Sequence, residues 1–405
     1  MKVPALIAPL LVFLAQPFSA AAFECSPPTA VEQPAREFSN ADFDVRIRRF
    51  ETGFNPESGY CYTQARMAFA PDGRGIFTCS ALYLGGMDVY SGLFYAQTSD
   101  FGKTWTPFKA SKTVRRVPSG DTEKMFLDPS PFYHSASGKF VILGAMLSYR
   151  GNKHLGDHRA AYAVFDESSG DFSAPRALPV PFAISGAGCV QVLEKEGGRV
   201  LVPISFSSGR KANSSVCVLE CSFDGAEFGV EKIGGAISHS VPRGVCEPSI
   251  IEASGWYYLS LRNDETSYIA RSRDGLNYEP KVPLKFDDGA LVGSYNTQTH
   301  WLSSGGSAYL VYTRRGANND HVFRHRAPLF AARLDPEKLA LARSTETAVV
   351  PERGARLGNF GCVRVSDSKW VVVAAEWMQG AGGWRGCMAR GSNNSIFASE
   401  ILLKK

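Results

Sequence analysis

Beyond its N-terminus, the sequence has no long apolar run and no long run of charges of one sign. No later stretch approaches the roughly 18 uncharged apolar residues that a membrane-spanning helix needs. The 44 basic and 39 acidic residues are scattered, and the formal net charge of +5 is too small and dispersed for a nucleic-acid-binding or membrane-binding surface. We therefore expect neither nucleic acid nor a membrane as a partner. A substrate with one negative charge is compatible with this composition.

The first 22 residues form the one apolar run, and they are typical of a secretory signal peptide. Lys2 precedes the apolar stretch, which closes with the small residues Ala20, Ala21 and Ala22. We expect cleavage near Phe23, so that the mature chain begins there. The protein is accordingly predicted to be secreted or periplasmic, and the mature chain to be soluble.

Metal-binding spacings are missing as well. The chain has no CxxC motif and no Cys/His group with zinc spacing, so we expect no metal site and no cofactor. Nine cysteines are an odd number for an exported protein, which permits some disulfides, leaves at least one thiol unpaired and leaves the pairing open. They are Cys25, Cys61, Cys79, Cys189, Cys217, Cys221, Cys246, Cys362 and Cys387.

The remaining composition favours an all-β protein of some size. Hydrophobic residues make up 44% of the chain and aromatic residues 12%, with 39 glycines and 23 prolines, which excludes disorder, collagen-like repeats and coiled coils. Short alternating apolar segments, typical of strands, recur along the chain. They include Gly75–Ala81, Lys139–Ala145, Arg199–Ile204, Trp256–Leu261, Ala308–Thr313 and Trp370–Ala375.

Turns that contain Asp, Gly and often an aromatic residue follow these segments at regular intervals. The turn aspartates are Asp100, Asp166, Asp224, Asp274 and Asp335, at steps of 66, 58, 50 and 61 residues. A period of this size with several strands per unit is typical of a β-propeller blade. In such a turn the Asp side chain binds backbone amides and the aromatic residue packs on its blade, so we interpret the turn as structural.

These repeats lead to a specific prediction of the architecture. Five turns plus a last unit over residues 356–405 give six blades, and the early strand around Asp44–Phe50 is expected to pair with the last blade and close the ring. We therefore predict a single six-bladed β-propeller domain over residues 23–405, and a monomer. No helix longer than two turns is required.

The segment Thr98–Trp105, with the sequence TSDFGKTW, resembles the Asp-box of the sialidase (neuraminidase) superfamily. The resemblance implies a secreted exo-glycoside hydrolase that cleaves a terminal acidic sugar from a glycan or glycoconjugate. Members carry a catalytic Asp before the strand that leads into the first Asp-box, and Asp88 has this place, which implies a general acid/base role.

The resemblance also implies a set of arginines that holds the sugar carboxylate. Glu247 at the head of a strand and Arg262 fifteen residues later resemble the family's Glu and Arg pair, and Arg326 matches a further arginine. Arg66 is our choice for the first arginine, and Glu376 for the Glu that orients it. Three guanidinium groups that converge on one point bind a carboxylate with more directionality than lysines. The alternatives are Arg46 or Arg48 for the first arginine and Arg324 for the third.

One departure from the family pattern concerns the nucleophile, which is a Tyr in sialidases and is aligned here with Phe360. Two alternatives remain open. The polar segment 293–301 could present Tyr295 as a replacement nucleophile, with Gln298 and His300 as substrate-binding neighbours. Otherwise a carboxylate activates water directly, and the reaction inverts the anomeric centre.

Two further functions remain compatible with the sequence. A polysaccharide lyase would neutralise a uronate carboxylate with the arginines and abstract the adjacent proton with Tyr295, His300 or His321. A carbohydrate-binding propeller without turnover agrees with the missing Tyr, but not with the retained Asp88 and Glu247.

Overall fold

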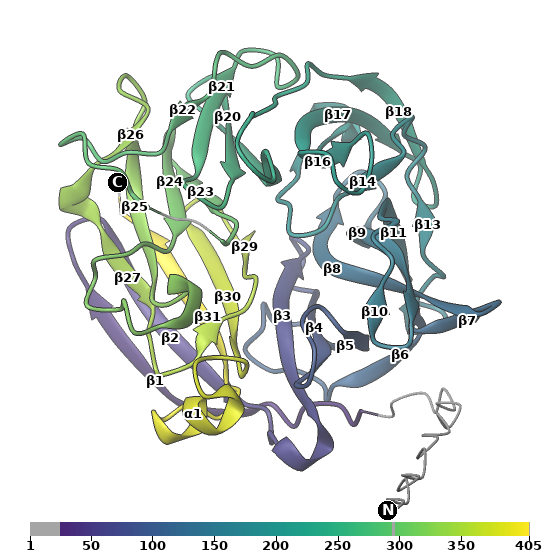
Figure 1. Cartoon of the computed structure of the whole chain (residues 1–405). Helices are drawn as coiled ribbons and strands as arrows, with labels where there is room; N and C mark the ends of the chain where they lie inside the picture. Colours follow the sequence, from purple (N-terminus) through teal and green to yellow (C-terminus); the bar gives the residue numbers. More distant parts are fainter. Residues whose placement is uncertain (1–24, 294–295, 405) are drawn as a thin grey trace, which may run out of the picture.

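The computed structural model describes residues 25–293 and 296–404 (Figure 1). The predicted signal peptide therefore lies outside the described residues, as does Tyr295. The described strands form six antiparallel sheets arranged around a common axis (Figure 1). The order of the sheets around the ring follows the order of the chain, as expected for a propeller.

Five sheets are each made from one continuous stretch of chain. The first contains β3 (Tyr60–Phe69), β4 (Gly75–Tyr83), β5 (Tyr90–Thr98) and β6 (Lys109–Arg115). The second contains β7 (Val117–Ser119), β8 (Thr122–His134), β9 (Lys139–Arg150), β10 (Lys153–His154), β11 (Arg159–Asp166), β12 (Asp171–Phe172) and β13 (Arg176–Ala177). The third contains β14 (Ile184–Gly186), β15 (Leu193–Glu194), β16 (Val200–Ser207), β17 (Ser215–Phe223) and β18 (Phe228–Ile233). The fourth contains β19 (Cys246–Ala253), β20 (Trp256–Arg262), β21 (Tyr268–Ser272) and β22 (Val282–Pro283). The fifth contains β23 (His300–Ser304), β24 (Ser307–Tyr312), β25 (Leu329–Asp335), β26 (Ala340–Leu341) and β27 (Thr347–Val350).

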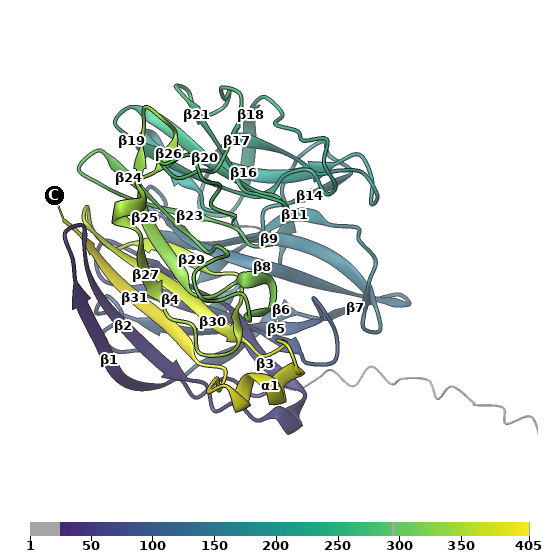
Figure 2. The ribbon, with the colours of Figure 1, turned by 60° about the vertical axis from the view of Figure 1, so that its left-hand side comes forward.

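The sixth sheet joins the two ends of the chain. It contains β1 (Val31–Ser39), β2 (Phe43–Glu51), β28 (Arg356–Leu357), β29 (Gly361–Arg364), β30 (Lys369–Trp377) and β31 (Ile396–Leu403). β2 pairs with β31 from Phe43 opposite Leu403 to Phe50 opposite Ile396, which confirms the predicted pairing of the early strand with the last unit. Figure 2 shows β1 and β2 beside β31 and β30 at the edge of the ring.

The predicted number of six blades is wrong. The propeller has five blades of contiguous chain, and the sixth sheet is a composite closure rather than a sixth equivalent repeat. The physical reason is that residues 356–404 supply only part of a sheet, so that β1 and β2 complete it. Sharing a sheet between the two ends leaves no open seam in the ring.

The extent to which a strand is buried depends on its place in its sheet. β3 is buried at all ten positions, because an inner strand is covered on both faces, whereas β2 alternates between buried and more exposed residues. The six apolar segments predicted as strands fall in or largely within β4, β9, β16, β20, β24 and β30, which confirms those predictions. Between the sheets, Trp301 is fully buried and its indole N–H donates to the Ser249 carbonyl at 3.0 Å.

The turn after β5 has the structural geometry predicted for it. The Asp100 carboxylate accepts hydrogen bonds from the Thr104 amide at 2.9 Å and from the hydroxyls of Thr104 and Thr98 at 2.6 and 2.7 Å. These bonds hold the pKa of Asp100 well below its usual range. Trp105 then packs edge-on against Phe77, with ring centroids 5.3 Å apart.

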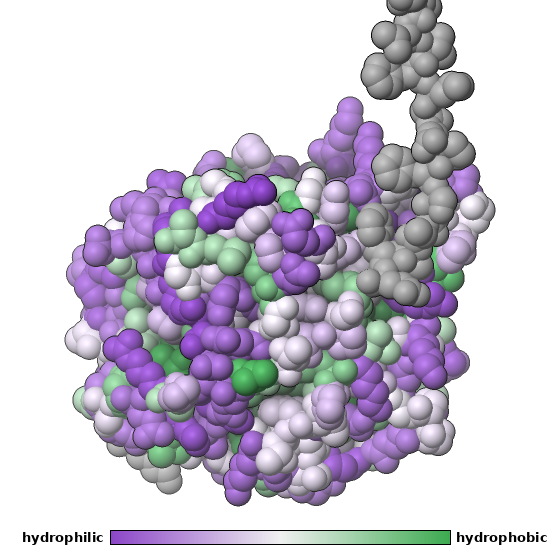
Figure 3. Space-filling view, turned by 90° about the horizontal axis from the view of Figure 1, so that it is seen from below, coloured by the Kyte–Doolittle hydropathy of each residue, from purple (hydrophilic) through white to green (hydrophobic). Residues whose placement is uncertain are grey.

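Helical structure is confined to short segments: α1 (Gly383–Ala389) and the 3-10 turns η1 (Pro56–Ser58), η2 (Glu196–Gly198), η3 (Phe323–His325) and η4 (Arg343–Thr345). Within residues 25–293 and 296–404, no helix has the length and apolar character needed to cross a bilayer. All nine cysteines lie in the described ranges and are free thiols. On the face drawn in Figure 3, hydrophilic and apolar residues are interspersed.

Candidate active site

A backbone feature recurs at the central end of the inner strands. Gln64, Asp128 and Glu247 have φ values of 57°, 54° and 46°, and each lies at a register shift where its strand pairs with the next one. Cys189 and Asn296, which precede β15 and β23, have φ values of 57° and 63°. The left-handed conformation is unfavourable for residues other than Gly, and such strain concentrates at functional sites.

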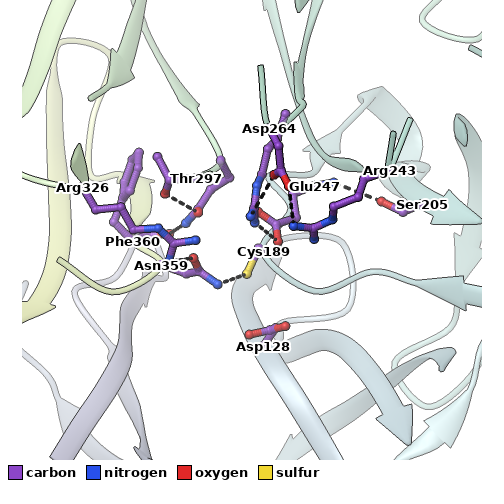
Figure 4. A network of polar contacts seen from close by, with 12 residues as sticks. Asp128, Cys189, Ser205, Arg243, Glu247, Asp264, Thr297, Arg326, Asn359 and Phe360 are labelled. Carbon is purple, nitrogen blue, oxygen red and sulfur yellow. Dashed lines mark hydrogen bonds and ion pairs between the residues drawn. The ribbon is translucent and has the colours of Figure 1, made fainter. Parts of the chain in front are cut away.

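Contacts show that four of these side chains meet at the axis. The Gln64 amide donates to Asp128 Oδ1 at 2.5 Å, and the Cys189 thiol lies 3.9 Å from Gln64 Oε1. The charge of Glu247 acts on both Asp128 and Cys189. Figure 4 shows Asp128, Cys189 and Glu247 directed toward the same central space, with Arg326 approaching from the opposite side.

Glu247 and Arg262 form an ion pair across the β19–β20 hairpin. Arg262 Nη1 lies 2.6 Å from Glu247 Oε1, and Arg262 is almost fully buried. Burial alone lowers the pKa of Arg262, but the surrounding negative charges, Glu247 first, outweigh burial and raise it. Among the described residues, Glu247 Oε2 has no hydrogen-bond partner. The pair is thus fixed on one side and leaves one carboxylate oxygen for another partner.

Arg326 and Arg356 are buried cations for which the described residues supply no acidic partner. Arg326 is 3% exposed and donates from Nη1 to Asn359 Oδ1 at 3.2 Å, while no described residue accepts from its Nε. Arg356 is 1% exposed and, within the part of the chain that the structure describes, all three of its nitrogens lack a hydrogen-bond partner. Its guanidinium carbon lies 3.6 Å from the centre of the Trp377 ring and 4.9 Å from that of Phe323.

These arginines repel one another. Burial, followed by the charges of Arg262 and Arg356, lowers the pKa of Arg326 to about 9. Burial, followed by the charge of Arg324, lowers the pKa of Arg356 to about 10. A buried charge is unfavourable unless it is paired and hydrogen-bonded, and an arriving anion supplies both. The cluster therefore has the character of an anion-binding site.

Arg66 has a different surrounding from the other predicted arginines. Its Nε donates to the Phe360 carbonyl at 3.1 Å, its Nη1 to the Pro129 carbonyl at 2.6 Å and its Nη2 to Cys189 Sγ at 3.2 Å. Each guanidinium nitrogen thus already has a protein acceptor. Arg66, on β3, thus connects that strand to β8 and to the chain before β15 and β29.

The expected pair of Arg66 with Glu376 is not formed. Glu376 is buried and its Oε2 accepts hydrogen bonds from the amides of Asn393 and Ser395 at 3.0 and 2.8 Å. Its cationic partner is Arg353, at 3.3 Å from Oε1. Arg353 approaches from the loop before β28, whereas the guanidinium of Arg66 is directed across the axis. Glu376 therefore supports the last sheet.

Asp128 is a central carboxylate that the sequence analysis did not identify. It is half-buried, and burial, followed by the negative charge of Glu247, raises its pKa to about 6. The charge of Arg66 and a hydrogen bond from the Cys189 thiol oppose this rise. Its Gln64 partner is fixed in turn, because the same amide nitrogen lies 2.9 Å from the Tyr90 hydroxyl.

Cys189 connects Asp128 to the arginine cluster. Its Sγ accepts from Arg66 and, at 3.0 Å, from the Asn359 amide, whose Oδ1 accepts from Arg326 (Figure 4). Burial, followed by the charge of Asp128, raises the pKa of Cys189 well above its usual value, so that it remains a thiol. Hydrogen bonds thus run from Arg326 through Asn359 and Cys189 to Asp128.

Asp88 lies in the connection between β4 and β5, with an exposed side chain. Its backbone carbonyl accepts from the Tyr149 hydroxyl, and in the described ranges no hydrogen bond or ion pair reaches its carboxylate. Its negative charge contributes to the pKa values of Asp128 and Arg356, so it lies near the same site.

Gln298 and His300 lie beneath the central space and support Phe360. Both are buried and both donate to the Phe360 carbonyl at 3.0 Å, Gln298 from Nε2 and His300 from Nε2. His300 Nδ1 accepts from the Ser249 hydroxyl at 2.7 Å. Burial, followed by the charge of Arg66, lowers the pKa of His300 to about 3, so the ring is neutral.

The alternative arginines lie elsewhere. Arg48 pairs with Glu32 at 2.7 Å and Arg46 with Glu37 at 3.2 Å, both on the outer strands of the composite sheet. Arg324 lies on η3, near Arg262. Burial, followed by the charge of Arg262, lowers the pKa of Arg324. Across the residues that the structure describes, no group of His, Cys, Asp or Glu is arranged to hold a metal ion.

Five central residues, of which only Glu247 was predicted as a site residue, recur at a regular spacing that becomes evident from their left-handed backbone conformation. Gln64, Asp128, Cys189, Glu247 and Asn296 follow one another at steps of 64, 61, 58 and 49 residues, close to the steps of the turn aspartates. The type of residue differs at each of these positions. Only the spacing and the backbone conformation are repeated. Arg356 and Asn359 carry no such signal.

Comparisons with known proteins place the chain by fold. No protein-family model and no curated protein sequence matches it. A Dyadobacter fermentans protein of unknown function is similar with a TM-score of 0.60 and 16% identity, over 85% of this chain and 96% of that one. Trypanosoma rangeli sialidase in complex with sialic acid is similar with a TM-score of 0.57 and 12% identity, over 93% of this chain and 58% of that one. A Hadza microbial sialidase gives a TM-score of 0.57 and 10% identity, over 84% and 65%.

These identities show the fold alone. The chain spans about three fifths of the length of the two sialidase chains. Its all-β propeller is thus sialidase-like, as the resemblance of the Thr98–Trp105 turn implied.

Proposed function

We propose that this chain is a secreted glycoside hydrolase that removes a terminal acidic sugar from a glycan. The observation that carries the proposal is the set of buried arginines, Arg326 and Arg356, that have no acidic partner among the described residues. They lie beside the Glu247–Arg262 ion pair, so a cationic cluster adjoins a carboxylate with a free oxygen. This combination suits a sugar that carries a carboxylate next to the bond to be cleaved.

The carboxylate of the substrate would be bound by Arg262, Arg326 and Arg356. Arg66 is replaced in this set by Arg356, because the nitrogens of Arg66 already donate to protein acceptors. Guanidinium groups bind carboxylates through two parallel hydrogen bonds, and such bonds gain strength where water is excluded. A neutral sugar would leave the arginines unpaired. The cluster would therefore also favour acidic sugars over neutral ones.

The reaction would take place between the arginine cluster and the carboxylates around it. The resemblance assigns the acid/base role to Asp88 and a catalytic role to Glu247, with Tyr295 as the candidate nucleophile. Phe360 has no hydroxyl and its ring is fully buried. The proposal includes export through the predicted signal peptide, one catalytic domain over residues 23–405, and action as a monomer.

The test is a substrate screen with the mature chain, residues 23–405. Each acidic aryl glycoside, including an aryl sialoside and aryl uronides of both anomers, is paired with the neutral glycoside that has the same leaving group. Release of the aryl alcohol from at least one acidic substrate, with its neutral partner cleaved at least about 100-fold more slowly, is the expected result. Cleavage of neutral substrates only, or of none, contradicts the proposal. An unsaturated product that absorbs in the ultraviolet would indicate a lyase instead.

A further inference from the structure

We propose that Asp128 and Glu247 are the reacting carboxylates of this site, with Asp128 as the proton donor to the leaving oxygen and Glu247 as the base that activates water. The inference rests on the proposed function, and it assigns to Asp128 the role that the family resemblance gives to Asp88. It begins from the positions of the two residues in the fold.

Asp128 and Glu247 occupy equivalent places on their blades. Each is the left-handed residue at the register shift near the head of an inner strand, β8 in one case and β19 in the other. On the blade between them, Cys189 is a left-handed residue that lies before β15. Because the inner strands converge at the axis, the two carboxyl groups face one central space from either side of Cys189 (Figure 4).

Each carboxyl group has one oxygen with a fixed partner. Asp128 Oδ1 accepts from the Gln64 amide at 2.5 Å, and Glu247 Oε1 is paired with Arg262 at 2.6 Å. Glu247 Oε2 has no partner in the described ranges. A reacting carboxylate needs this arrangement, in which one oxygen fixes the geometry and the other is free to exchange a proton.

The surroundings give the two groups opposite tasks. Glu247 is ion-paired with Arg262 through Oε1, and among the described residues its Oε2 has no partner, so Oε2 is placed to accept a proton from water. Burial and the negative charge of Glu247 raise the pKa of Asp128 to about 6, so Asp128 keeps its proton into the mildly acidic range. A glycosidase that inverts its substrate uses one protonated carboxyl group as the acid and one carboxylate as the base.

Asp88 is less suited to the proton-donor role in this structure. Its side chain is exposed, and in the described part of the chain nothing fixes its carboxylate. A proton donor must be oriented toward the leaving oxygen. The hydrogen bonds from Gln64 and Cys189 fix the orientation of the Asp128 carboxyl group. Asp88 is left with an electrostatic influence at the edge of the site.

The step balances without a covalent intermediate. The Asp128 proton passes to the glycosidic oxygen as the bond from that oxygen to the anomeric carbon breaks. The oxygen of a water molecule forms the new bond to the anomeric carbon, and its proton passes to Glu247 Oε2. Asp128 ends ionised and Glu247 protonated, and exchange with bulk water restores both. Direct attack by water inverts the anomeric configuration and needs no Tyr, in agreement with Phe360.

The experiment compares Asp128→Asn, Asp88→Asn and a matched structural control, Asp171→Asn. Asp171 lies on the same sheet as Asp128, is buried, and accepts from the Ser111 hydroxyl and the Lys112 amide at 2.8 and 2.7 Å, away from the axis. The substrates are one acidic aryl glycoside with a poor leaving group and one with 2,4-dinitrophenol, which leaves without a proton. Folding of each variant is checked by thermal unfolding.

Asp128→Asn is expected to lower kcat/KM by at least about 10²-fold with the poor leaving group and by less than about 10-fold with dinitrophenol. The alkaline fall in kcat/KM near pH 6 should disappear in this variant. Asp171→Asn should change stability only, and Asp88→Asn should lose less than about 10-fold on both substrates. NMR of the first product should show the inverted anomer.

Two outcomes overturn the inference while leaving the proposed function in place. One is an active wild type whose Asp128→Asn variant is unchanged or loses equally on both substrates. The other is a retained anomeric configuration. A wild type inactive on every acidic aryl glycoside contradicts the proposed function itself, and with it the step assigned here.

Discussion

The guanidinium group of Arg356 lies 3.6 Å from the centre of the Trp377 ring, buried to 1% exposure and without an acidic partner among the described residues. An aromatic ring face attracts a cation, but it supplies no hydrogen-bond acceptor for the nitrogens. The protein therefore holds a desolvated cation whose hydrogen-bonding capacity is unused. Such an arrangement is unfavourable for the empty protein and favourable for binding an anion.

The first prediction concerns this burial. Arg356→Met keeps much of the side-chain volume and removes the charge, so we expect the free energy of unfolding to be unchanged or to rise by about 1 kcal/mol. At the same time KM for the acidic substrate should rise at least about 10-fold. Thermal unfolding and steady-state kinetics measure the two effects. A variant that loses stability and keeps its KM would show that Arg356 is a structural residue only.

The second prediction concerns Arg326. Arg326→Lys keeps the charge but loses the planar pair of donors, so KM for an acidic substrate should rise about 10-fold or more, with little effect on any neutral substrate. The control is Arg333→Lys on β25, the strand that follows Arg326 in the chain, where the side chain is exposed. Equal effects of the two substitutions would remove Arg326 from the carboxylate-binding set.

The third prediction concerns stability against pH. The pKa of Asp128 is raised to about 6 in the folded chain from an ordinary value of 3.8, so the folded state binds this proton more tightly than the unfolded state. The resulting stabilisation is complete below about pH 4 and is lost as the pH rises through about 6. Its full size is about 3 kcal/mol, of which about 2 kcal/mol is lost between pH 4 and pH 7.

Denaturant unfolding at pH 4 and pH 7 measures this effect. The wild type should lose about 2 kcal/mol more than Asp128→Asn between the two pH values, because the amide does not titrate. An identical pH dependence in both proteins would mean that Asp128 titrates as it does in the unfolded chain.

The fourth prediction concerns Tyr295. If water attacks directly, Tyr295→Phe should keep at least about a tenth of the wild-type kcat, since no covalent bond to the phenol is needed. A loss of several orders of magnitude, measured with the same acidic aryl glycoside, would make Tyr295 the nucleophile and would favour a retaining reaction.

The sequence predicts the features of this protein that are local. Alternation of apolar residues predicts the strands, and the spaced turn aspartates predict the propeller, because both depend on neighbours within one hairpin. Glu247 and Arg262 are predicted together for the same reason, since they lie on one hairpin. The sheet that closes the ring is also predictable, because residues 44–50 need a partner strand.

Residues that depend on packing across the axis could not be predicted in this way. The family resemblance pairs Arg66 with Glu376, but in the structure Arg353 is the cation that pairs with Glu376. Asp128 faces the axis only because its backbone adopts a left-handed φ of 54°, which reverses the alternation along β8. No pattern of residue types marks such a reversal in the sequence.

The most direct test of the central claim is the affinity of the wild-type chain for one acidic sugar and for its methyl ester. The two ligands differ in the charge of one group, so their difference isolates the carboxylate that the arginine cluster would bind. Isothermal titration with the product sugar identified in the substrate screen should give a dissociation constant at least about 100-fold lower for the acid, equivalent to about 2.7 kcal/mol. Equal affinity for acid and ester would contradict the account, because it would mean that the buried arginines do not bind the substrate.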